Sequence, residues 1–280
     1  MTWSSGRVVP SAACEGVVAA RENVVAALFA AGAQAVHDDG PAVVTHFPGD
    51  ADLGRIRTAI AAADAGATLA TSEAADVDWS RAWREGLTAH EAGGFVVTPP
   101  WLATEGEDPG RIIIDPGMAF GTGDHPTTRG VLRLMRWVIK PGDAVADLGA
   151  GSAVLAIAAA RLGAARVAAI ELDAGAIGNA EENVARNGAP GVVRVIQGDA
   201  LVLLPLVAPV HVILANILSG LLTQLLPAMR AALAPGGKAI LSGMLHDERD
   251  AMLAVFDGAG WRVDAEDTED AWWSATISPR

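Results

Sequence analysis

The sequence predicts an α/β protein whose C-terminal part is a Rossmann-like sheet of seven strands, preceded by a small α+β domain and a linker helix. Two observations lead to this prediction. From Ala144 onward, short apolar runs of strand character alternate with longer stretches of helical spacing. This alternation is typical of a mostly parallel sheet covered by helices on both faces. Before residue 75 the order is strand, helix, strand, strand, helix, strand, which suggests a ferredoxin-like domain.

The N-terminal domain is expected to span residues 1–74. Its strands are separated by turn residues such as Asp38-Asp39-Gly40-Pro41, and its helices have apolar residues at helical spacing. Either Asp50 or Asp52 is placed to cap the second helix. The expected elements, in order, are strand Trp3–Val9, helix Glu15–Ala31, strands Ala35–His37 and Ala42–Phe47, helix Leu53–Ala63 and strand Ala67–Thr71.

Residues 75–92 are expected to form a linker. The acid-rich tract Glu73–Asp78 runs into a segment that contains Trp79 and Trp83. Two residues four positions apart share one face of a helix, so we expect a linker helix that packs both indoles on a domain surface. The second domain is then expected to span residues 93–280.

The sheet of the second domain begins with a βαβ unit. The apolar strand Ala144–Leu148 runs into Gly149-Ala150-Gly151, a helix follows to Leu162, and a second strand, Arg166–Ile170, ends on Glu171. Glycines let the backbone approach a ligand that any Cβ would hold away. An acid about 20 residues beyond the turn is placed to accept hydrogen bonds from a ribose diol. The pattern therefore predicts a cofactor that contains adenosine.

The details of the turn indicate which cofactor. A dinucleotide fingerprint has glycine at its first, third and sixth positions, but the sixth position here is Val154. The pattern is nearer to the G-x-G-x-G loop of S-adenosylmethionine-dependent methyltransferases, although Ala153 replaces the last glycine. A glycine turn alone is weak evidence, because a tight structural loop has the same composition.

The rest of the chain completes the sheet. The last two strands are joined by a short acidic connection, Asp264–Asp270, so we expect them to pair as an antiparallel hairpin. Ligands of such sheets bind beyond the carboxyl ends of the strands. Gly149, Glu171, Asp199 and Asn216 all fall there. The remaining strands are expected at Val192–Gln197, Val210–Ala215, Lys238–Leu241, Trp261–Val263 and Trp273–Ile277.

The composition narrows the class of protein. The chain is 51% hydrophobic, yet no uninterrupted apolar stretch is long enough to span a membrane, and no signal peptide is evident. Its single cysteine, Cys14, fits a reducing compartment, so we expect a cytoplasmic protein. The formal charge of −13 disfavours nonspecific nucleic-acid binding and tolerates a basic protein as substrate. The scattered histidines have no metal-ligand spacing, so no metal is expected.

The most specific feature of the chain is a loop in the second domain, before the glycine turn. The run Phe120-Gly121-Thr122-Gly123-Asp124-His125-Pro126-Thr127-Thr128 precedes the helix that leads to the first sheet strand. Together with Trp79/Trp83, Val97-Thr98-Pro99-Pro100-Trp101, the Gly149 turn and Ala215-Asn216-Ile217-Leu218, this loop resembles the bacterial ribosomal-protein methyltransferase family PrmA. That family methylates a basic protein of the large subunit on lysine side chains and on its N-terminal amine. The resemblance therefore implies S-adenosylmethionine as the methyl donor.

The resemblance also implies roles for individual residues. Thr128, Gly149, Glu171 and Asn216 stand at positions that contact the cofactor in the family, and Gly151 belongs to the same turn. Phe120 is expected to close over the methionine part. Asp199 is a candidate for the adenine amine or a cap of the next helix. Asn216 is expected to be catalytic by holding the amine, the alternative being a strand end that caps the next helix. Glu171 stands where an aspartate is usual, and Asp124 and Ala153 replace a threonine and a glycine.

Three alternatives stand beside this function. The same chemistry could act on another protein, such as an electron-transfer flavoprotein subunit. A nucleotide-linked oxidoreductase is disfavoured by Val154 and by the Asn216 segment. A non-catalytic cofactor-binding relative is suggested by Ala153 and Asp124. His125 is a possible base, but a histidine beside proline in a loop is more often structural.

Overall fold

The structure is a computed structural model, and it divides into two compact units, Met1–Gly86 and Leu87–Arg280. It describes residues 3–10, 24–25, 27–28, 31, 36–39, 42–48, 51–73, 88–104, 106, 108–116 and 123–280. Each unit is described by itself. The expected linker segment around Trp79 and Trp83 lies outside the described residues, as do Cys14 and Phe120.

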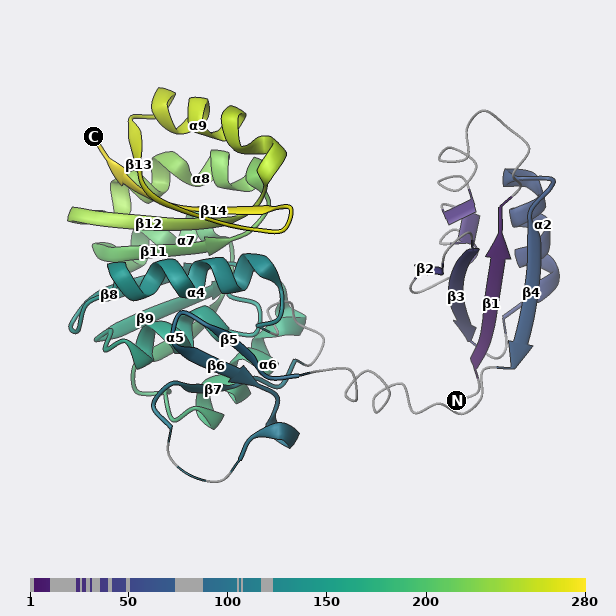
Figure 1. The fold of residues 1–280 in the computed structure, drawn as a ribbon, viewed down its shortest axis with the longest axis horizontal. Helices are drawn as coiled ribbons and strands as arrows, with labels where there is room; N and C mark the ends of the chain where they lie inside the picture. The colour runs from purple at the N-terminus through teal and green to yellow at the C-terminus, as the bar shows by residue number, and fades with distance from the viewer. Residues whose placement is uncertain are drawn as a thin grey trace. The chain divides into compact units, whose positions relative to one another are not determined.

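The first unit contains a four-stranded sheet in the order β2-β3-β1-β4, with every neighbouring pair antiparallel (Figure 1). This order places the first strand in the centre, as a ferredoxin-like β-α-β-β-α-β chain requires. Asp52 caps helix α2 by accepting hydrogen bonds from the amides of Gly54 and Arg55 at 2.9 and 3.1 Å. The elements are β1 (Trp3–Val9), β2 (Val36–Asp39), β3 (Ala42–Pro48), α2 (Leu53–Ala63) and β4 (Thr68–Glu73).

The core of this unit lies between the sheet and its helices. Ile56 and Ile60, one turn apart on α2, pack with Val8, Val43 and Phe47 from the sheet. Val24 and Leu28 join the same cluster and have helical backbone, inside the range expected for the first helix. The rest of that expected helix lies outside the described residues.

The second unit is built on a seven-stranded sheet in the order β10-β9-β8-β11-β12-β14-β13 (Figure 1). Strands β10, β9, β8, β11 and β12 run parallel to one another, whereas β14 is antiparallel to both β12 and β13. The predicted parallel sheet with an antiparallel last strand is confirmed. The strands are β8 (Ala144–Leu148), β9 (Arg166–Glu171), β10 (Val193–Gln197), β11 (Val210–Asn216), β12 (Leu233–Leu245), β13 (Trp261–Glu269) and β14 (Trp272–Pro279).

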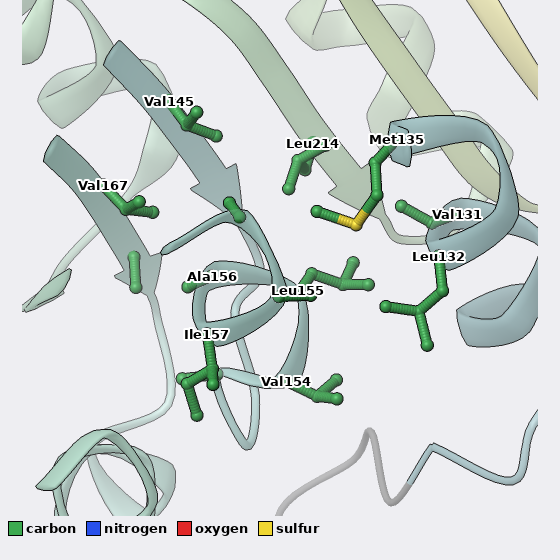
Figure 2. Close-up of a cluster of buried hydrophobic side chains, with 14 of the residues drawn as sticks. Val131, Leu132, Met135, Val145, Val154, Leu155, Ala156, Ile157, Val167 and Leu214 are labelled. Carbon is green, nitrogen blue, oxygen red and sulfur yellow. The ribbon is translucent and has the colours of Figure 1, made fainter. Parts of the chain in front are cut away.

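Helices cover both faces of this sheet. Val145, Val167 and Leu214 face one cluster with α4, α5 and α6, and alternate residues such as Ala146 and Ile213 face another with α7, α8 and α9. Figure 2 shows the first cluster, in which Met135 points from α4 toward Leu214 and Leu155. The helices are α4 (Pro126–Val138), α5 (Val154–Arg161), α6 (Ala174–Arg186), α7 (Ala200–Val207), α8 (Ser219–Ala232) and α9 (Arg249–Gly258), with 3₁₀ turns η1 (Pro100–Leu102) and η2 (His246–Glu248).

The strand expected at Trp261–Val263 extends to Glu269, and the expected acidic connection is therefore wrong. β13 is the edge strand, and its acidic side chains pair with arginines and a lysine from neighbouring elements. These ion pairs let a charged segment form a strand that its composition disfavours. Only Asp270 and Ala271 remain between β13 and β14.

A small three-stranded sheet, β5 (His90–Ala92), β6 (Phe95–Thr98) and β7 (Arg111–Ile113), completes the second unit. Two asparagines, Asn183 in α6 and Asn187 at its C-cap, join this small sheet to α6. The Asn187 side chain exchanges hydrogen bonds with the backbone of Ile113, and that of Asn183 does so with the backbone of Asp115. In the described part of the chain, no helix is long and apolar enough to cross a membrane.

Candidate active site

A cavity of about 450 Å³ opens at the carboxyl ends of the strands. It lies where the strand order reverses between β8 and β11, the usual ligand site of open α/β sheets. A second cavity of about 320 Å³ shares Gly149, Glu171, Ile217 and Leu221 with the first, so the two flank the same carboxylate. The first is lined by His125, Thr127, Gly149, Gly151, Glu171, Asp173, Ala176, Asn216, Ile217, Leu218, Leu221, Gly243 and Trp272.

The glycine turn after β8 brings bare backbone to both cavities. Gly149 has a φ of +72°, and a Cβ built there would lie 2.5 Å from Ile217 Cγ2. Gly151 also has a positive φ, of +51°. Ala153 adopts a φ of +66°, which explains why glycine is usual at this position in the family that the motif resembles.

Glu171 ends β9 with its carboxylate held by two backbone amides. Its Oε2 accepts from the amide of Gly151 at 2.8 Å, and its Oε1 accepts from the amide of Asp173 at 2.9 Å. A carboxylate has about four acceptor sites, so each oxygen keeps one for a ligand hydroxyl. The extra methylene of glutamate thus still delivers an oriented carboxylate to the cleft.

Asn216 ends β11 and lines the first cavity. Its amide nitrogen donates to the hydroxyl of Thr128 at 3.4 Å. Thr128 itself is fully buried and is absent from the cavity lining, where its neighbour Thr127 stands. In the structure, Thr128 therefore contacts Asn216, and its contact with the cofactor stays a prediction.

Asp199 both caps a helix and lines the second cavity. Its Oδ1 accepts from the amide of Leu201 at 2.8 Å, so it is the N-cap of α7. The apolar side chains of Ile170, Leu201 and Leu225 line the same cavity. The helix-cap alternative for Asp199 is present, and its place in the lining keeps a contact with an adenine amine geometrically available.

Two residues with aromatic rings, His125 and Trp272, belong to the site, although the place of His125 beside a proline favoured a structural role. His125 is the N-cap of α4, and its ring meets the ring of Trp272 edge to face at 4.9 Å. Both line the cavity, whereas the adjacent Trp273 is fully buried in the core. Neighbouring residues on a strand point to opposite faces, so the sequence could indicate that one indole faces outward but not which one.

An ionisable group lies buried directly beneath the turn. Asp147 is 1% exposed, and neither of its carboxyl oxygens has a hydrogen-bond partner in the described part of the chain. Burial raises the pKa of Asp147 to about 7, and the charge of Glu171 raises it further, while the nearby amide of Ala156 opposes this without forming a well-aligned hydrogen bond.

The described residues fit an adenosyl group. A fixed carboxylate suits a ribose diol, and the glycine turn leaves space that a Cβ would fill. The apolar second cavity suits a planar base. Gly149, Gly151, Glu171, Asn216 and Asp199 come together at this edge of the sheet, Thr128 lies behind Asn216, and Phe120 is outside the described residues.

Comparisons with known proteins agree with this geometry. The family model described as ribosomal protein L11 methyltransferase (PrmA) matches residues 7–279. A protein named ribosomal protein L11 methyltransferase from Thermus thermophilus is 36% identical over 258 residues, which cover 92% of this chain and 95% of that protein. One of the same name from Pelotomaculum thermopropionicum is 38% identical over 206 residues, covering 73% of this chain and 66% of that protein.

A solved structure supports the same assignment. The ribosomal protein L11 methylase from Lactobacillus delbrueckii subsp. bulgaricus has a TM-score of 0.59 and 29% identity, and the match covers 67% of this chain and 95% of that chain. The match to the family model spans nearly the whole sequence, including most of the N-terminal unit. This chain belongs to the ribosomal protein L11 methyltransferase family, PrmA.

Proposed function

We propose that this protein transfers methyl groups from S-adenosylmethionine to amines of ribosomal protein L11, both lysine side chains and the N-terminal α-amine. The observation that carries the proposal is the cavity in which Glu171, the glycine turn and Asn216 meet, in a chain of this family. The names of the relatives do not favour the flavoprotein alternative or the non-catalytic one. Because ribosomal proteins are made in the cytoplasm, we propose that the enzyme works there.

The described residues account for cofactor binding. Glu171 would hold the ribose hydroxyls through the acceptor sites that the amides of Gly151 and Asp173 leave free. Gly149 and Gly151 let the backbone approach the ligand. When bound, S-adenosylmethionine supplies an electrophilic methyl group on a sulfonium. Glu171 and Asp173 both line the cavity, so their negative charge would favour a cationic ligand there.

The acceptor amine must be neutral to attack. At pH 7 this costs about 4.6 kcal/mol for a lysine with a pKa of about 10.4, and about 1 kcal/mol for an α-amine with a pKa of about 7.8. Ile217 and Trp272, both half-buried, provide apolar surface that disfavours a charged amine by desolvation. The site can therefore lower the cost of deprotonation without a dedicated strong base.

Asn216 is the proposed positioning group for the amine. Its amide nitrogen donates to the hydroxyl of Thr128. This hydrogen bond orients the amide, and the amide oxygen is then the atom that can accept a hydrogen bond from the amine. Orientation of this kind lowers the barrier by placing the nitrogen in line with the methyl group. This scheme needs no general base, so His125 is part of the cavity wall and not a catalytic base.

The proposal is tested by intact-mass analysis of purified L11 after reaction with the enzyme and S-adenosylmethionine. We expect mass increases in whole methyl steps on wild type. Asn216→Ala should keep the fold and lose most of the transfer, by about 100-fold. An unchanged L11 mass with the wild-type enzyme contradicts the substrate, and an unchanged rate with Asn216→Ala contradicts the role of that residue.

A further inference from the structure

The N-terminal half of α4 lies directly against the β13–β14 hairpin (Figure 1). The closest approach is at Gly130, where an added Cβ would lie 2.5 Å from Ser274 Oγ on β14. Arg129 precedes this glycine, and Arg133 lies four positions after Arg129, so both side chains leave the helix on the same side. They meet the acidic end of β13.

Four side chains form one ion-pair network there. Arg129 Nε donates to Glu269 Oε1 at 2.8 Å, and Arg133 Nη2 donates to Glu269 Oε2 at 2.7 Å. Arg133 also binds Asp267 through two parallel hydrogen bonds of 2.8 and 2.5 Å. The side chains are between 19% and 34% exposed, so the pairs are partly shielded from water. Arg129 holds the pKa of Glu269 below its usual range, which keeps this carboxylate ionised.

This network joins the two segments that carry the aromatic wall of the cavity. Arg129 also donates to the backbone carbonyl of Asp124, the residue directly before His125. Glu269 is the last residue of β13, and Trp272 begins β14 across the short turn. The edge-to-face contact of His125 with Trp272 therefore lies at the point where the Arg129–Glu269 pair draws the two segments together.

We propose that Arg129 and Glu269 are positioning residues for methyl transfer, which hold His125 against Trp272 and so shape the acceptor side of the cavity. This inference rests on the proposed function for its activity readout. The cofactor side is held independently, by the amides of Gly151 and Asp173 on Glu171. The network should therefore affect the amine acceptor more than the methyl donor.

The test uses Arg129→Met and Glu269→Gln in the full-length protein. We expect kcat with L11 to fall about 10- to 100-fold, because small displacements of positioning groups have effects of this size. The dissociation constant of the cofactor, measured by calorimetry, should change less than about 3-fold. The double variant should be no worse than either single variant, since the two residues act as one unit. Arg129→Lys keeps the charge but loses the fork that spans two partners, so it should restore only part of the rate.

Asp264→Asn is the matched control. Asp264 lies on the same strand and pairs with Lys238 and Arg262, away from the cavity lining. Its loss should lower the midpoint of thermal unfolding as the loss of Glu269 does, and leave kcat unchanged. If Arg129→Met and Glu269→Gln lower the midpoint but keep kcat, the network only stabilises the fold and the proposal is wrong.

A second readout does not depend on the acceptor. The NMR signals of the His125 ring protons should be displaced by the ring current of Trp272 in wild type and should move in Arg129→Met and Glu269→Gln, but not in Asp264→Asn. Signals that stay in place in all three variants overturn the positioning role. If wild type does not methylate L11, the proposed function fails, and the NMR comparison still decides whether the network places His125.

Discussion

At the scale of single residues, the cofactor side of the site depends on one carboxylate in a fixed orientation. Both oxygens of Glu171 already accept a backbone amide, and each keeps an acceptor site for a hydroxyl. Glu171→Gln has only one acceptor oxygen, so it must leave an amide or a ribose hydroxyl without a partner. We expect cofactor affinity to fall by about 1.5–3 kcal/mol, the usual worth of hydrogen bonds to a charged group.

Calorimetric titration of S-adenosylmethionine into Glu171→Gln measures this loss. Glu182→Gln is a suitable control, because Glu182 is an exposed acid of α6 outside both cavities and its change removes the same charge from the protein. An affinity equal to that of the control variant would mean that Glu171 does not bind the sugar.

Asp147 predicts a specific dependence of stability on pH. The pKa of Asp147 is raised to about 7 by burial, well above the value of about 3.9 in an unfolded chain. The unfolded chain therefore releases this proton first, and the contribution of Asp147 to stability falls as pH rises from about 4 to about 7. Above about pH 7 the free energy of unfolding lost by burying the ionised Asp147 carboxylate is constant, at up to about 4 kcal/mol.

Asp147→Asn removes the ionisable group and should be more stable than wild type at pH 8 by up to that amount, and nearly equal to it at pH 4. Urea unfolding of both proteins at the two pH values gives the difference. A stability difference that does not grow with pH would show that the carboxyl group titrates normally despite its burial.

Some residues of the candidate site could be predicted from the sequence, and others could not. Gly149, Glu171 and Asn216 could be predicted because each directly follows or ends an apolar strand. The carboxyl ends of parallel strands lie at the same edge of the sheet, where ligands bind. That Thr128 contacts the cofactor stays a prediction; its burial depends on how α4 packs, and no local pattern encodes that. Trp272 and His125 meet across more than 140 residues of sequence, so their contact could not be inferred from spacing.

At the scale of elements, α6 holds the small sheet in place through asparagines. Asn183 is fully buried and bonds both backbone groups of Asp115 as well as the carbonyl of Ser152. Asn183→Ala removes the acceptor of the Asp115 amide and the donor to the Ser152 carbonyl, while Asn179 still donates to the carbonyl of Asp115. We therefore expect it to lower the free energy of unfolding by about 2–3 kcal/mol. Asn179 donates to the carbonyl of Asp115 at 3.0 Å and accepts a longer bond from Asn183 at 3.4 Å, and its alanine variant should lose less than about 1.5 kcal/mol.

Chemical denaturation of the two variants gives both free energies. Equal losses would mean that the bonds of Asn183 contribute no more than one side-chain hydrogen bond. Because Asp115 leads into the segment that carries the family motif, we also expect Asn183→Ala to weaken cofactor binding, with Asn179→Ala as its control.

The elements themselves were predicted where pattern and burial agree. β8, α5 and β9 follow apolar runs bounded by glycine turns, and their observed ends differ little from the expected ones. β13 was predicted too short because its acidic residues resemble a solvated loop. The cations that pair with them come from α4, β12 and α9, so the strand depends on tertiary contacts that local sequence does not contain.

At the scale of the whole molecule, the chain combines a strongly acidic charge with the proposed site for a basic acceptor. The formal charge of −13 favours encounter with a basic protein through long-range attraction. The Debye length shortens from about 10 Å at 0.1 M salt to about 3 Å at 1 M, so this attraction should weaken steeply with salt. The cofactor pocket is local and should respond much less.

The two compact units suggest a division of labour. The second unit, Leu87–Arg280, contains the complete seven-stranded sheet, both of its cores and every described residue of the candidate site. We therefore propose that the first unit, which has its own sheet and core, recognises the protein substrate. A chain that begins at Asp78 should bind S-adenosylmethionine with nearly the full affinity, because it keeps every cavity residue.

The same truncated chain should have a higher KM for L11, by about 10-fold or more, while a short lysine peptide should be methylated at a rate close to that of the full chain. Calorimetry with the cofactor establishes that the truncated chain is folded before the kinetic comparison is made. If it methylates L11 with an unchanged KM, substrate recognition lies in the second unit, and the exposed leucines at the mouth of the cavity, Leu218 and Leu221, become the residues to substitute next.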